Sequence, residues 1–254
     1  MALSVDIRKA LGNFHLAVQF DAGDETLALL GASGCGKSVT LKCIAGILTP
    51  DEGHIELDGV TLYDSASRIN LPPQRRQVGY LFQQYALFPN MTVRQNIAAA
   101  VRDKARRQTE VAEKLRQFRL EAVADQKPGQ LSGGQQQRAA IARALVQRAR
   151  VLLADEPIAS LDPESSRNVM ETLRDLNQKD GLTVLVTLHQ VDYALSFCPR
   201  TIALKHGRVV YDGPSAELTP AFLKRLYGTE CDPLFVRPES DIRRNPPLTQ
   251  VQVA

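Results

Sequence analysis

The stretch "TLALLGASGCGKSVTLKCIAGIL", residues 26–48, constrains the fold more than any other part of this chain. An apolar run leads into a loop with glycines at 31, 34 and 36, and a helical pattern follows. The loop fits G-x-x-x-x-G-K-[ST], in which glycines let successive backbone N–H groups point into one concavity that binds phosphate. The helix after the loop adds its positive N-terminal end. We therefore expect a strand, a phosphate-binding loop and a helix, in that order.

Two side chains at the end of this loop complete the expected nucleotide site. Lys37 supplies a positive charge to the β- and γ-phosphates, and the Ser38 hydroxyl is a Mg²⁺ ligand. A glycine-rich turn without a ligand is the alternative, and the strand and helix on either side disfavour it. The residues predicted to bind the nucleotide here are Gly31, Ala32, Ser33, Gly34, Cys35, Gly36, Lys37, Ser38 and Val39.

Two adjacent carboxylates follow the apolar strand of "VLLADEP", residues 151–157. Two acids at the end of a buried strand are unfavourable unless a cation or a ligand is present. We expect Asp155 to hold the Mg²⁺ shell and Glu156 to polarise an attacking water. The alternative is a strand that simply ends in exposed carboxylates.

Two further polar residues stand at the ends of predicted strands. His189 follows the apolar strand 183–187, so a parallel sheet would place it beside Glu156 at the edge where ligands bind. Gln83, in "YLFQQYALFP", has a carbonyl that suits Mg²⁺ and an amide that suits water. We predict catalytic roles for both and a metal-ligand role for Gln83. The alternatives are a structural histidine and a solvated loop glutamine.

The remaining pattern favours an α/β fold. Apolar strands at 151–155 and 183–187 alternate with helices, one at about 135–148 and one with Val169, Leu173 and Leu176 on a single face. Continuous apolar strands between helices are typical of a parallel sheet covered on both faces. Short strands are expected over 3–30, and hairpins in "PDEGHIELDGVTLYD" and "TIALKHGRVVYDG".

A helical pattern is also expected from Thr92 to about Leu120. Thr92 and Gln95 have the spacing of a capping box. Val111, Leu115 and Phe118 then form an apolar stripe at i, i+4 and i+7.

Charge and composition exclude several classes of protein. A net charge of +3 is too small to argue for a nucleic-acid partner, and solvated helix faces explain most basic clusters, such as Arg75-Arg76 and Arg106-Arg107. The N-terminus lacks the apolar core of a signal peptide, and no stretch approaches ~20 apolar residues. We expect a soluble chain whose tie to a membrane runs through a partner. Four cysteines without metal-ligand spacing indicate reduced thiols: Cys35, Cys43, Cys198 and Cys231.

A second glycine pair occurs about a hundred residues after the first loop. "LSGGQ", residues 131–135, runs directly into a predicted helix. Ser132, Gly133 and Gly134 at a helix start would form a second anion site. One small chain therefore carries two expected phosphate-binding loops.

Together these stretches resemble the ATP-binding subunit of an ABC transporter, over about residues 3–228. The motifs that carry the resemblance are the loop 31–38, Gln83, "LSGGQ" at 131–135, Asp155-Glu156, "SLDP" at 160–163 and His189. Small P-loop GTPases and kinases lack the "LSGGQ" and this histidine. The chain has neither the coiled-coil insertion nor the tandem nucleotide domains of non-transport ABC ATPases, and its catalytic residues are intact, which disfavours an inactive subunit.

The resemblance implies an α/β P-loop NTPase fold with a parallel-sheet core, an N-terminal antiparallel β subdomain and an inserted helical subdomain at about 84–130. It implies one ATP-binding domain over 1–229, followed by a Pro-rich, loosely ordered tail over 230–254.

It also implies an ATPase coupled to transport, with ATP and Mg²⁺ as cofactors, that works as a head-to-tail homodimer. Each ATP would lie between the phosphate loop of one chain and the "LSGGQ" of the other, so Ser132, Gly133, Gly134, Gln135 and Asp162 join the nucleotide-binding set. Phe14 would stack on adenine, or else be a core aromatic residue.

The other implied partners are membrane-spanning permease subunits, which the helical insert contacts, and a periplasmic or extracellular solute-binding protein. The chain would lie on the cytoplasmic face of the inner membrane, as a peripheral subunit.

The two halves of the chain resemble different importers of oxyanions. Residues of about 25–100 look like the molybdate and sulfate importer ATPases, and residues of about 131–229 look like the phosphonate importer ATPase. The closer similarity of the second half favours phosphonate. Molybdate or sulfate is the alternative, and a recombined gene would explain the difference.

Overall fold

The computed structural model describes residues 3–83, 86–101, 103–147 and 149–228, and the predicted tail over 230–254 lies outside them. The described strands form one mixed sheet, in the order β6-β5-β4-β1-β2-β11-β10-β3-β9-β8-β7. The strands are β1 (Leu3–Leu11), β2 (Phe14–Ala22), β3 (Thr26–Leu30), β4 (Glu52–Leu57), β5 (Val60–Asp64), β6 (Ile69–Asn70), β7 (Val78–Leu81), β8 (Val151–Asp155), β9 (Thr183–Thr187), β10 (Arg200–Lys205) and β11 (Arg208–Pro214).

The predicted parallel core is confirmed. Strands β10, β3, β9, β8 and β7 pair in parallel, each with the next. Every residue of β3, β8 and β9 is buried, because helices cover both faces of this part of the sheet. These are the strands that read as continuous apolar runs.

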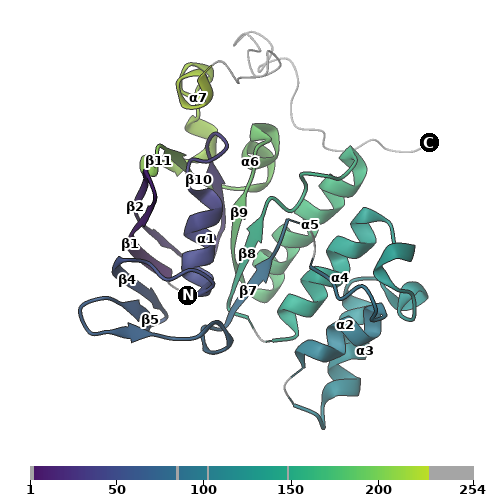
Figure 1. Cartoon of the computed structure of the whole chain (residues 1–254). Helices are drawn as coiled ribbons and strands as arrows, with labels where there is room; N and C mark the ends of the chain where they lie inside the picture. Colours follow the sequence, from purple (N-terminus) through teal and green to yellow (C-terminus); the bar gives the residue numbers. More distant parts are fainter. Residues whose placement is uncertain (1–2, 84–85, 102, 148, 229–254) are drawn as a thin grey trace, which may run out of the picture.

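The antiparallel strands lie on the other side of β10, on the left in Figure 1. β1 pairs with β2 and with β4, β4 pairs with β5, and β10 turns back into β11. The expected hairpin over residues 201–213 is confirmed and turns at His206 and Gly207, both at positive φ, as tight two-residue turns require. β11 joins β2 through the single pair Arg208↔Ala17, so the antiparallel part continues the parallel sheet.

Two hydrophobic cores lie on opposite faces of the parallel strands. In β8, Val151 and Leu153 pack with Ile44 of helix α1, whereas Leu152 and Ala154 pack with Ile141 of helix α4. Because neighbouring side chains of a strand point to opposite faces, α1 and α4 are separated by the sheet, as Figure 1 also shows. The helices are α1 (Lys37–Ala45), α2 (Val93–Ala100), α3 (Arg107–Gln117), α4 (Gly133–Leu145), α5 (Pro163–Asp180), α6 (Val191–Phe197) and α7 (Pro220–Tyr227), with 3₁₀ turns η1 (Pro73–Arg75), η2 (Glu121–Val123), η3 (Pro128–Gln130) and η4 (Ser215–Glu217).

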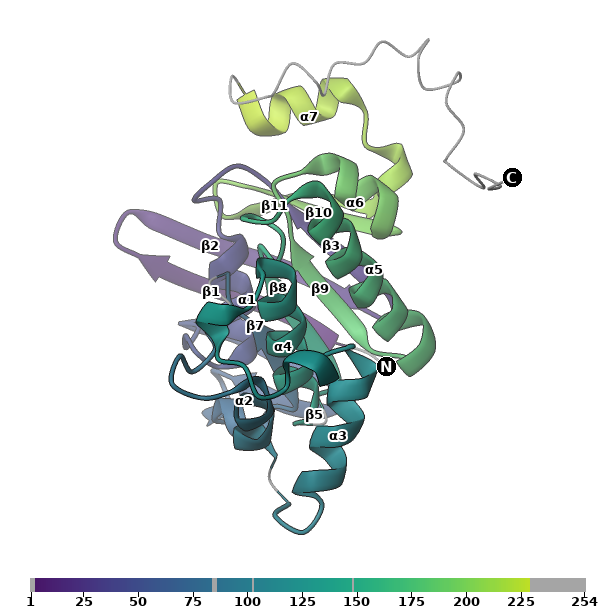
Figure 2. The ribbon, with the colours of Figure 1, turned by 90° about the vertical axis from the view of Figure 1, so that its right-hand side faces the viewer.

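The helical pattern expected after Thr92 corresponds to two helices, α2 and α3. The capping box of Thr92 and Gln95 is confirmed at the start of α2. The helix stops at Val101, which is extended, and the Asp103 carboxylate then accepts a hydrogen bond from the Ala105 N–H. Such local bonds compete with helix formation, which explains the break. The apolar stripe is buried as expected in α3 and its C-cap, and Figure 2 shows α2 and α3 beside α4.

The helix predicted at about 135–148 begins two residues earlier, at Gly133, and ends at Leu145. The Ser132 side chain caps it, so both glycines of the pair lie inside its first turn.

Arg76 contradicts the expectation that basic clusters lie on solvated faces. Its side chain is 1% exposed, and its guanidinium donates to the carbonyls of Cys43, Ile44 and Leu71 and to Asn70 Oδ1. The first two carbonyls belong to the last turn of α1, where the negative end of the helix dipole lies, and the Cys43 carbonyl also accepts from the Gly46 N–H. One guanidinium therefore fixes the end of the helix that follows the phosphate loop.

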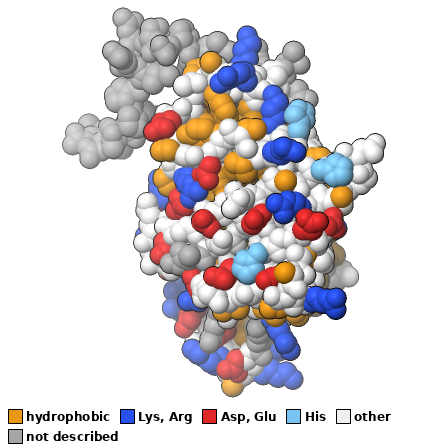
Figure 3. All heavy atoms as spheres, turned by 90° about the vertical axis from the view of Figure 1, so that its left-hand side faces the viewer, with side chains coloured by type: hydrophobic (Ala, Val, Ile, Leu, Met, Phe, Trp, Pro, Cys, Tyr) orange, Lys and Arg blue, Asp and Glu red, His pale blue; other side chains and the backbone are white. Residues whose placement is uncertain are grey.

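The outer face of the antiparallel strands carries charges of both signs. Figure 3 shows acidic and basic side chains interspersed over this face, with hydrophobic groups gathered toward the end where α7 lies. A face of this kind lacks the single-signed field that attracts a phosphate backbone. Among the described residues, no helix combines the length and the apolar character needed to span a bilayer.

Candidate nucleotide site

The loop 31–36 adopts a conformation that requires its glycines. Gly31, Gly34 and Gly36 have φ values of 144°, 75° and 110°. A Cβ at Gly31 would lie 2.3 Å from the Leu204 carbonyl oxygen, and one at Gly36 would lie 2.5 Å from Leu16 Cδ1. No other residue fits these positions, so the loop can curve toward the start of α1 as the motif predicted.

Lys37 folds back across the loop. Its side chain is buried, and Nζ donates to the Gly31 carbonyl at 2.6 Å and to the Ala32 carbonyl at 3.3 Å. A buried ammonium is stable only with such acceptors. The positive charge is therefore held at the mouth of the phosphate loop.

Asp155 lies at the end of β8 and receives three hydroxyl hydrogen bonds. Ser38 Oγ and Thr187 Oγ1 donate to its Oδ1 at 2.7 Å and 3.1 Å, and the Tyr80 hydroxyl donates to its Oδ2 at 2.8 Å. Burial, together with the nearby Asp155 charge, raises the pKa of Tyr80. The structure thus joins Ser38 and Asp155, as predicted. It adds Tyr80 and Thr187, which sequence reasoning missed because only strand register brings them here.

Glu156 sits in a strained turn directly after this strand. Its φ is 49°, in the left-handed region that non-glycine residues rarely adopt. Its N–H donates to Thr187 Oγ1 at 2.8 Å, and its Oε1 lies 2.6 Å from His189 Nε2. The side chain of Glu156 is 16% exposed and that of His189 is 43% exposed. The predicted proximity of Glu156 and His189 is therefore present, at a position that solvent reaches.

Gln83 lies on the same edge of the sheet, without a described contact to the carboxylates. β7 pairs with β8 through Leu81↔Ala154, and Gln83 follows in an exposed turn. Gln84 lies outside the described residues. The predicted position of Gln83 at a strand-to-loop junction is confirmed.

A pocket of about 590 Å³ adjoins the phosphate loop. Phe14 and residues of the loop line it, together with Lys205 and Tyr227 from the other side. The Phe14 ring lies against the loop, because a Cβ at Gly36 would be 3.1 Å from its Cζ. The Tyr227 hydroxyl accepts a hydrogen bond from the Gly31 N–H at 3.3 Å. The pocket has an aromatic wall beside a phosphate loop, a combination that suits a nucleotide.

The second glycine pair lies at the start of α4. Ser132 and Gln135 form a reciprocal capping box, in which Ser132 Oγ accepts from the Gln135 N–H and Gln135 Oε1 accepts from the Ser132 N–H. Asp162 caps α5 and accepts from the Ser165 N–H, and hydrogen bonds from Ser165 lower the pKa of Asp162. Gly134 packs against this same serine, because a Cβ at Gly134 would lie 3.3 Å from Ser165 Oγ. Residues 132–135 and 162 therefore belong to one surface.

That surface is separate from the phosphate loop of the same chain. α4 lies on the face of the sheet opposite α1. Among the described residues that line the pocket beside the phosphate loop, none belongs to 132–135. The structure thus does not bring the two predicted halves of the nucleotide set together within one chain.

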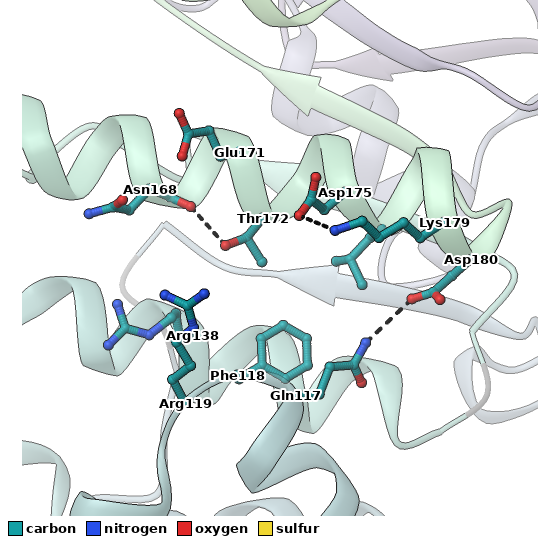
Figure 4. A pocket seen from close by; sticks show the side chains of 11 residues that line it. Gln117, Phe118, Arg119, Arg138, Asn168, Glu171, Thr172, Asp175, Lys179 and Asp180 are labelled. Carbon is teal, nitrogen blue, oxygen red and sulfur yellow. Dashed lines mark hydrogen bonds and ion pairs between the residues drawn. The ribbon is translucent and has the colours of Figure 1, made fainter. Parts of the chain in front are cut away.

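A hollow of about 400 Å³ lies elsewhere, between α3 and α5 (Figure 4). Arg119 and Arg138 gather at one end of it, and Asp175 pairs with Lys179 at 2.8 Å near the other. None of the predicted site residues lines this hollow, so it is distinct from the nucleotide site.

Comparisons with known proteins decide the family. Residues 15–159 match the family model described as ABC transporter. The chain belongs to the ABC transporter family.

The similar curated proteins are ATP-binding proteins of phosphonate import. The "Phosphonates import ATP-binding protein PhnC" of Paraburkholderia xenovorans is 48% identical over 244 residues, which cover 90% of this chain and 80% of that protein. The "Phosphonates import ATP-binding protein PhnC 2" of Cupriavidus necator is 44% identical over 258 residues, with 92% and 88% covered.

Solved structures of ABC cassettes share the fold. The ATP-binding cassette MJ0796, described as a dimer bound to ADP and Pi, has a TM-score of 0.70 and 32% identity, covering 85% of this chain and 99% of its own. The cbiO1 protein from Clostridium perfringens, part of the ABC transporter complex cbiONQ, has a TM-score of 0.75 and 28% identity, with 88% and 91% covered. The expected family and the expected α/β fold of an ABC ATPase are therefore both confirmed.

Proposed function

We propose that this chain is the ATP-hydrolysing subunit of an ABC importer for phosphonates. The observation that carries the proposal is the group of Ser38, Asp155, Glu156 and His189 at one edge of the sheet, beside the phosphate loop. The Ser38 hydroxyl and the Asp155 carboxylate can bind a cation, and the Glu156 carboxylate beside His189 can accept a proton. Phosphoryl transfer from a nucleotide to water requires both functions. The relatives named above, which carry ATP binding in their names, support the same conclusion.

ATP is the proposed nucleotide. The N–H groups of residues 31–39 and the Lys37 ammonium would bind its phosphates, and the Phe14 ring in the adjoining pocket would stack on adenine. Lys37 would exchange its two carbonyl acceptors for phosphate oxygens, which are stronger partners because they are charged.

The donor set beside the loop fits Mg²⁺. Ser38 Oγ and Asp155 Oδ1 are hard oxygen donors, 2.7 Å apart, and the Gln83 carbonyl follows on the same edge. The part of the chain that the structure describes has no group of three His, Cys, Asp or Glu side chains for a metal, so phosphate oxygens would complete the shell. When bound, Mg²⁺ would neutralise the charge that develops on the phosphates.

Glu156 is the proposed general base for hydrolysis. It accepts a proton from the water whose oxygen attacks the γ-phosphorus, and ADP leaves as inorganic phosphate forms. His189 holds the Glu156 carboxylate through the 2.6 Å contact. With ATP bound, His189 would also contact the γ-phosphate, and the Gln83 amide would orient the water.

The catalytic unit would be a head-to-tail homodimer. Because α4 and α1 lie on opposite faces of the sheet, Ser132, Gly133, Gly134 and Gln135 can bind only the ATP of another chain. Asp162 caps the helix beside them and would belong to the same shared surface. The description of MJ0796 as a dimer supports this arrangement.

A groove of about 500 Å³ would receive the membrane-spanning permease. Ile47, Phe82 and Phe88 line it and are each more than a third exposed, and the Arg143 guanidinium lies 5.3 Å from the Phe88 ring centre. Exposed apolar groups of this kind mark interaction surfaces. We call these residues the docking groove. The helical insert over 84–130 forms one wall within the proposed 1–229 domain.

Docking to a permease would hold the chain on the cytoplasmic face of the inner membrane. A periplasmic or extracellular solute-binding protein would deliver the solute to that permease, and the proposal includes no nucleic-acid partner.

The phosphonate assignment takes precedence over molybdate or sulfate. The similarity to the two phosphonate import proteins covers 90% and 92% of this chain, and so includes both of its halves. A recombined gene is therefore not needed to explain the sequence.

A growth experiment tests the assignment. A strain lacking this gene should fail to grow on 2-aminoethylphosphonate as its phosphorus source and should grow normally on phosphate. The wild-type gene should restore growth, and the Lys37→Ala gene should not. A defect in sulfate use or in molybdoenzyme activity, with growth on the phosphonate intact, would reassign the solute.

A further inference from the structure

Tyr80 occupies a position that connects two proposed sites. In the parallel pair of β7 and β8, Tyr80 is level with Leu153. Leu153 and Asp155 are two residues apart and point to the same face, so the Tyr80 side chain can reach along β8 to the carboxylate. Its hydroxyl donates to Asp155 Oδ2 at 2.8 Å, while Ser38 and Thr187 both donate to Oδ1. Tyr80 alone holds the second oxygen among the described residues.

The ring of the same tyrosine lies in the docking groove. Its centre is 4.6 Å from that of the Phe82 ring, with an angle of 54° between the planes. Tyr80 and Phe82 both line the groove with Phe88. Phe82 is 39% exposed, so a molecule that enters the groove touches a ring already in contact with Tyr80.

We propose that Tyr80 is a positioning residue that fixes the Asp155 carboxylate and links it to the docking groove. This rests on the proposed function, which assigns Asp155 to Mg²⁺ and the groove to the permease. A partner that shifts Phe82 moves the Tyr80 ring, and the hydroxyl transmits the shift to the oxygen that orients the carboxylate. The connection consists of one ring contact and one hydrogen bond.

The first test removes only the hydroxyl. Mn²⁺ replaces Mg²⁺ as a probe whose binding to the ATP-bound chain can be followed by electron paramagnetic resonance. In Tyr80→Phe the metal concentration at half-saturation should rise about tenfold, as it does when other hydrogen-bond partners of metal-binding carboxylates are removed. ATP affinity without metal should stay unchanged. Tyr63→Phe is the matched control, because the buried Tyr63 also loses one hydrogen bond, to the Pro50 carbonyl. Equal metal affinity in Tyr80→Phe and Tyr63→Phe would overturn the positioning role.

The second test follows the groove directly. The chain contains no tryptophan, so Phe82→Trp introduces a single fluorescent reporter beside Tyr80. Mg²⁺ added to the ATP-bound chain should shift its emission, and adding Tyr80→Phe should abolish the shift even at saturating Mg²⁺. A shift that persists in the double variant, or no shift in either chain, would contradict the link. A parent chain that binds no ATP would contradict the proposed function itself, whereas normal ATP binding with an unaltered metal response contradicts only the role of Tyr80.

Discussion

Ser38 Oγ donates a 2.7 Å hydrogen bond to Asp155 Oδ1, although 117 residues separate them in the sequence. The bond joins the phosphate loop to the end of β8, so the two halves of the proposed Mg²⁺ site meet in one place. The fold brings them together because β3, which leads into the loop, is separated from β8 only by β9.

Ser38→Ala should weaken metal binding more than nucleotide binding. It removes a proposed Mg²⁺ ligand and leaves the loop N–H groups and Lys37 in place, so the Mg²⁺ requirement for ATP hydrolysis should rise at least about tenfold. Metal titration of phosphate release measures this. Ser196→Ala, at an exposed position of α6 outside the phosphate loop, is the control and should behave as wild type. An unchanged Mg²⁺ requirement in Ser38→Ala would exclude the serine as a ligand.

Mixing two inactive chains should restore activity. Lys37→Ala disables one phosphate loop, and Ser132→Arg blocks the ATP of the partner. A mixed dimer keeps one intact shared site, so an equal mixture should reach about a quarter of the wild-type rate, since half the dimers are mixed. ATPase assays on the mixture and on each parent measure it. A mixture no more active than its parents would argue against shared sites.

The removal of Arg76 should destabilise the fold. Arg76→Met removes the donor of the Ile44 and Leu71 carbonyls and one of the two donors of the Cys43 carbonyl, which should cost about 3 kcal/mol and lower Tm by roughly 6–12 °C. Thermal unfolding followed by circular dichroism measures the change. Arg75→Met, at the exposed neighbouring position, should stay near the wild-type Tm. Equal effects of the two substitutions would mean that the guanidinium contacts are dispensable.

Cys198 should make stability depend on alkaline pH. Burial raises the pKa of its thiol from 9.0 to about 12. The folded state keeps a proton that the unfolded chain loses near pH 9, so this stabilisation is complete below pH 9 and is lost as the pH rises toward 12. The free energy of unfolding of Cys198→Ala has no such contribution. The amount by which it lies below the wild-type value should therefore shrink by roughly 1.4 kcal/mol per pH unit above 9.

Urea unfolding of both chains between pH 8 and 10.5 provides the measurement for Cys198. A deficit that stays constant across this interval would contradict the buried, protonated thiol.

The local motifs could be predicted because their chemistry depends on neighbours in sequence. The loop ending at Lys37, the carboxylates at 155 and 156 and the capping box at Thr92 each need only a few consecutive residues. Strand hydrophobicity was sufficient to predict the parallel core and the proximity of His189 and Glu156, because the carboxyl ends of parallel strands share one edge.

Other features depend on register and packing, which the sequence does not display. Tyr80 and Thr187 reach Asp155 only because β7, β8 and β9 pair as they do. Arg76 looks like a surface charge until the end of α1 is placed beside it. The break after α2 depends on an Asp103 side-chain bond that competes with an otherwise helical pattern.

The most direct test of a shared site with Glu156 as its base is the state of Glu156→Gln after incubation with Mg²⁺ and ATP. The amide has nearly the shape of the carboxylate but cannot accept the proton, so turnover should fall at least about a hundredfold while ATP binding persists. Size-exclusion chromatography with light scattering, followed by nucleotide analysis of the peak, should find a particle of twice the chain mass that contains intact ATP. A particle of one chain mass, or a peak that contains ADP formed at the wild-type rate, would contradict a shared site with Glu156 as its base.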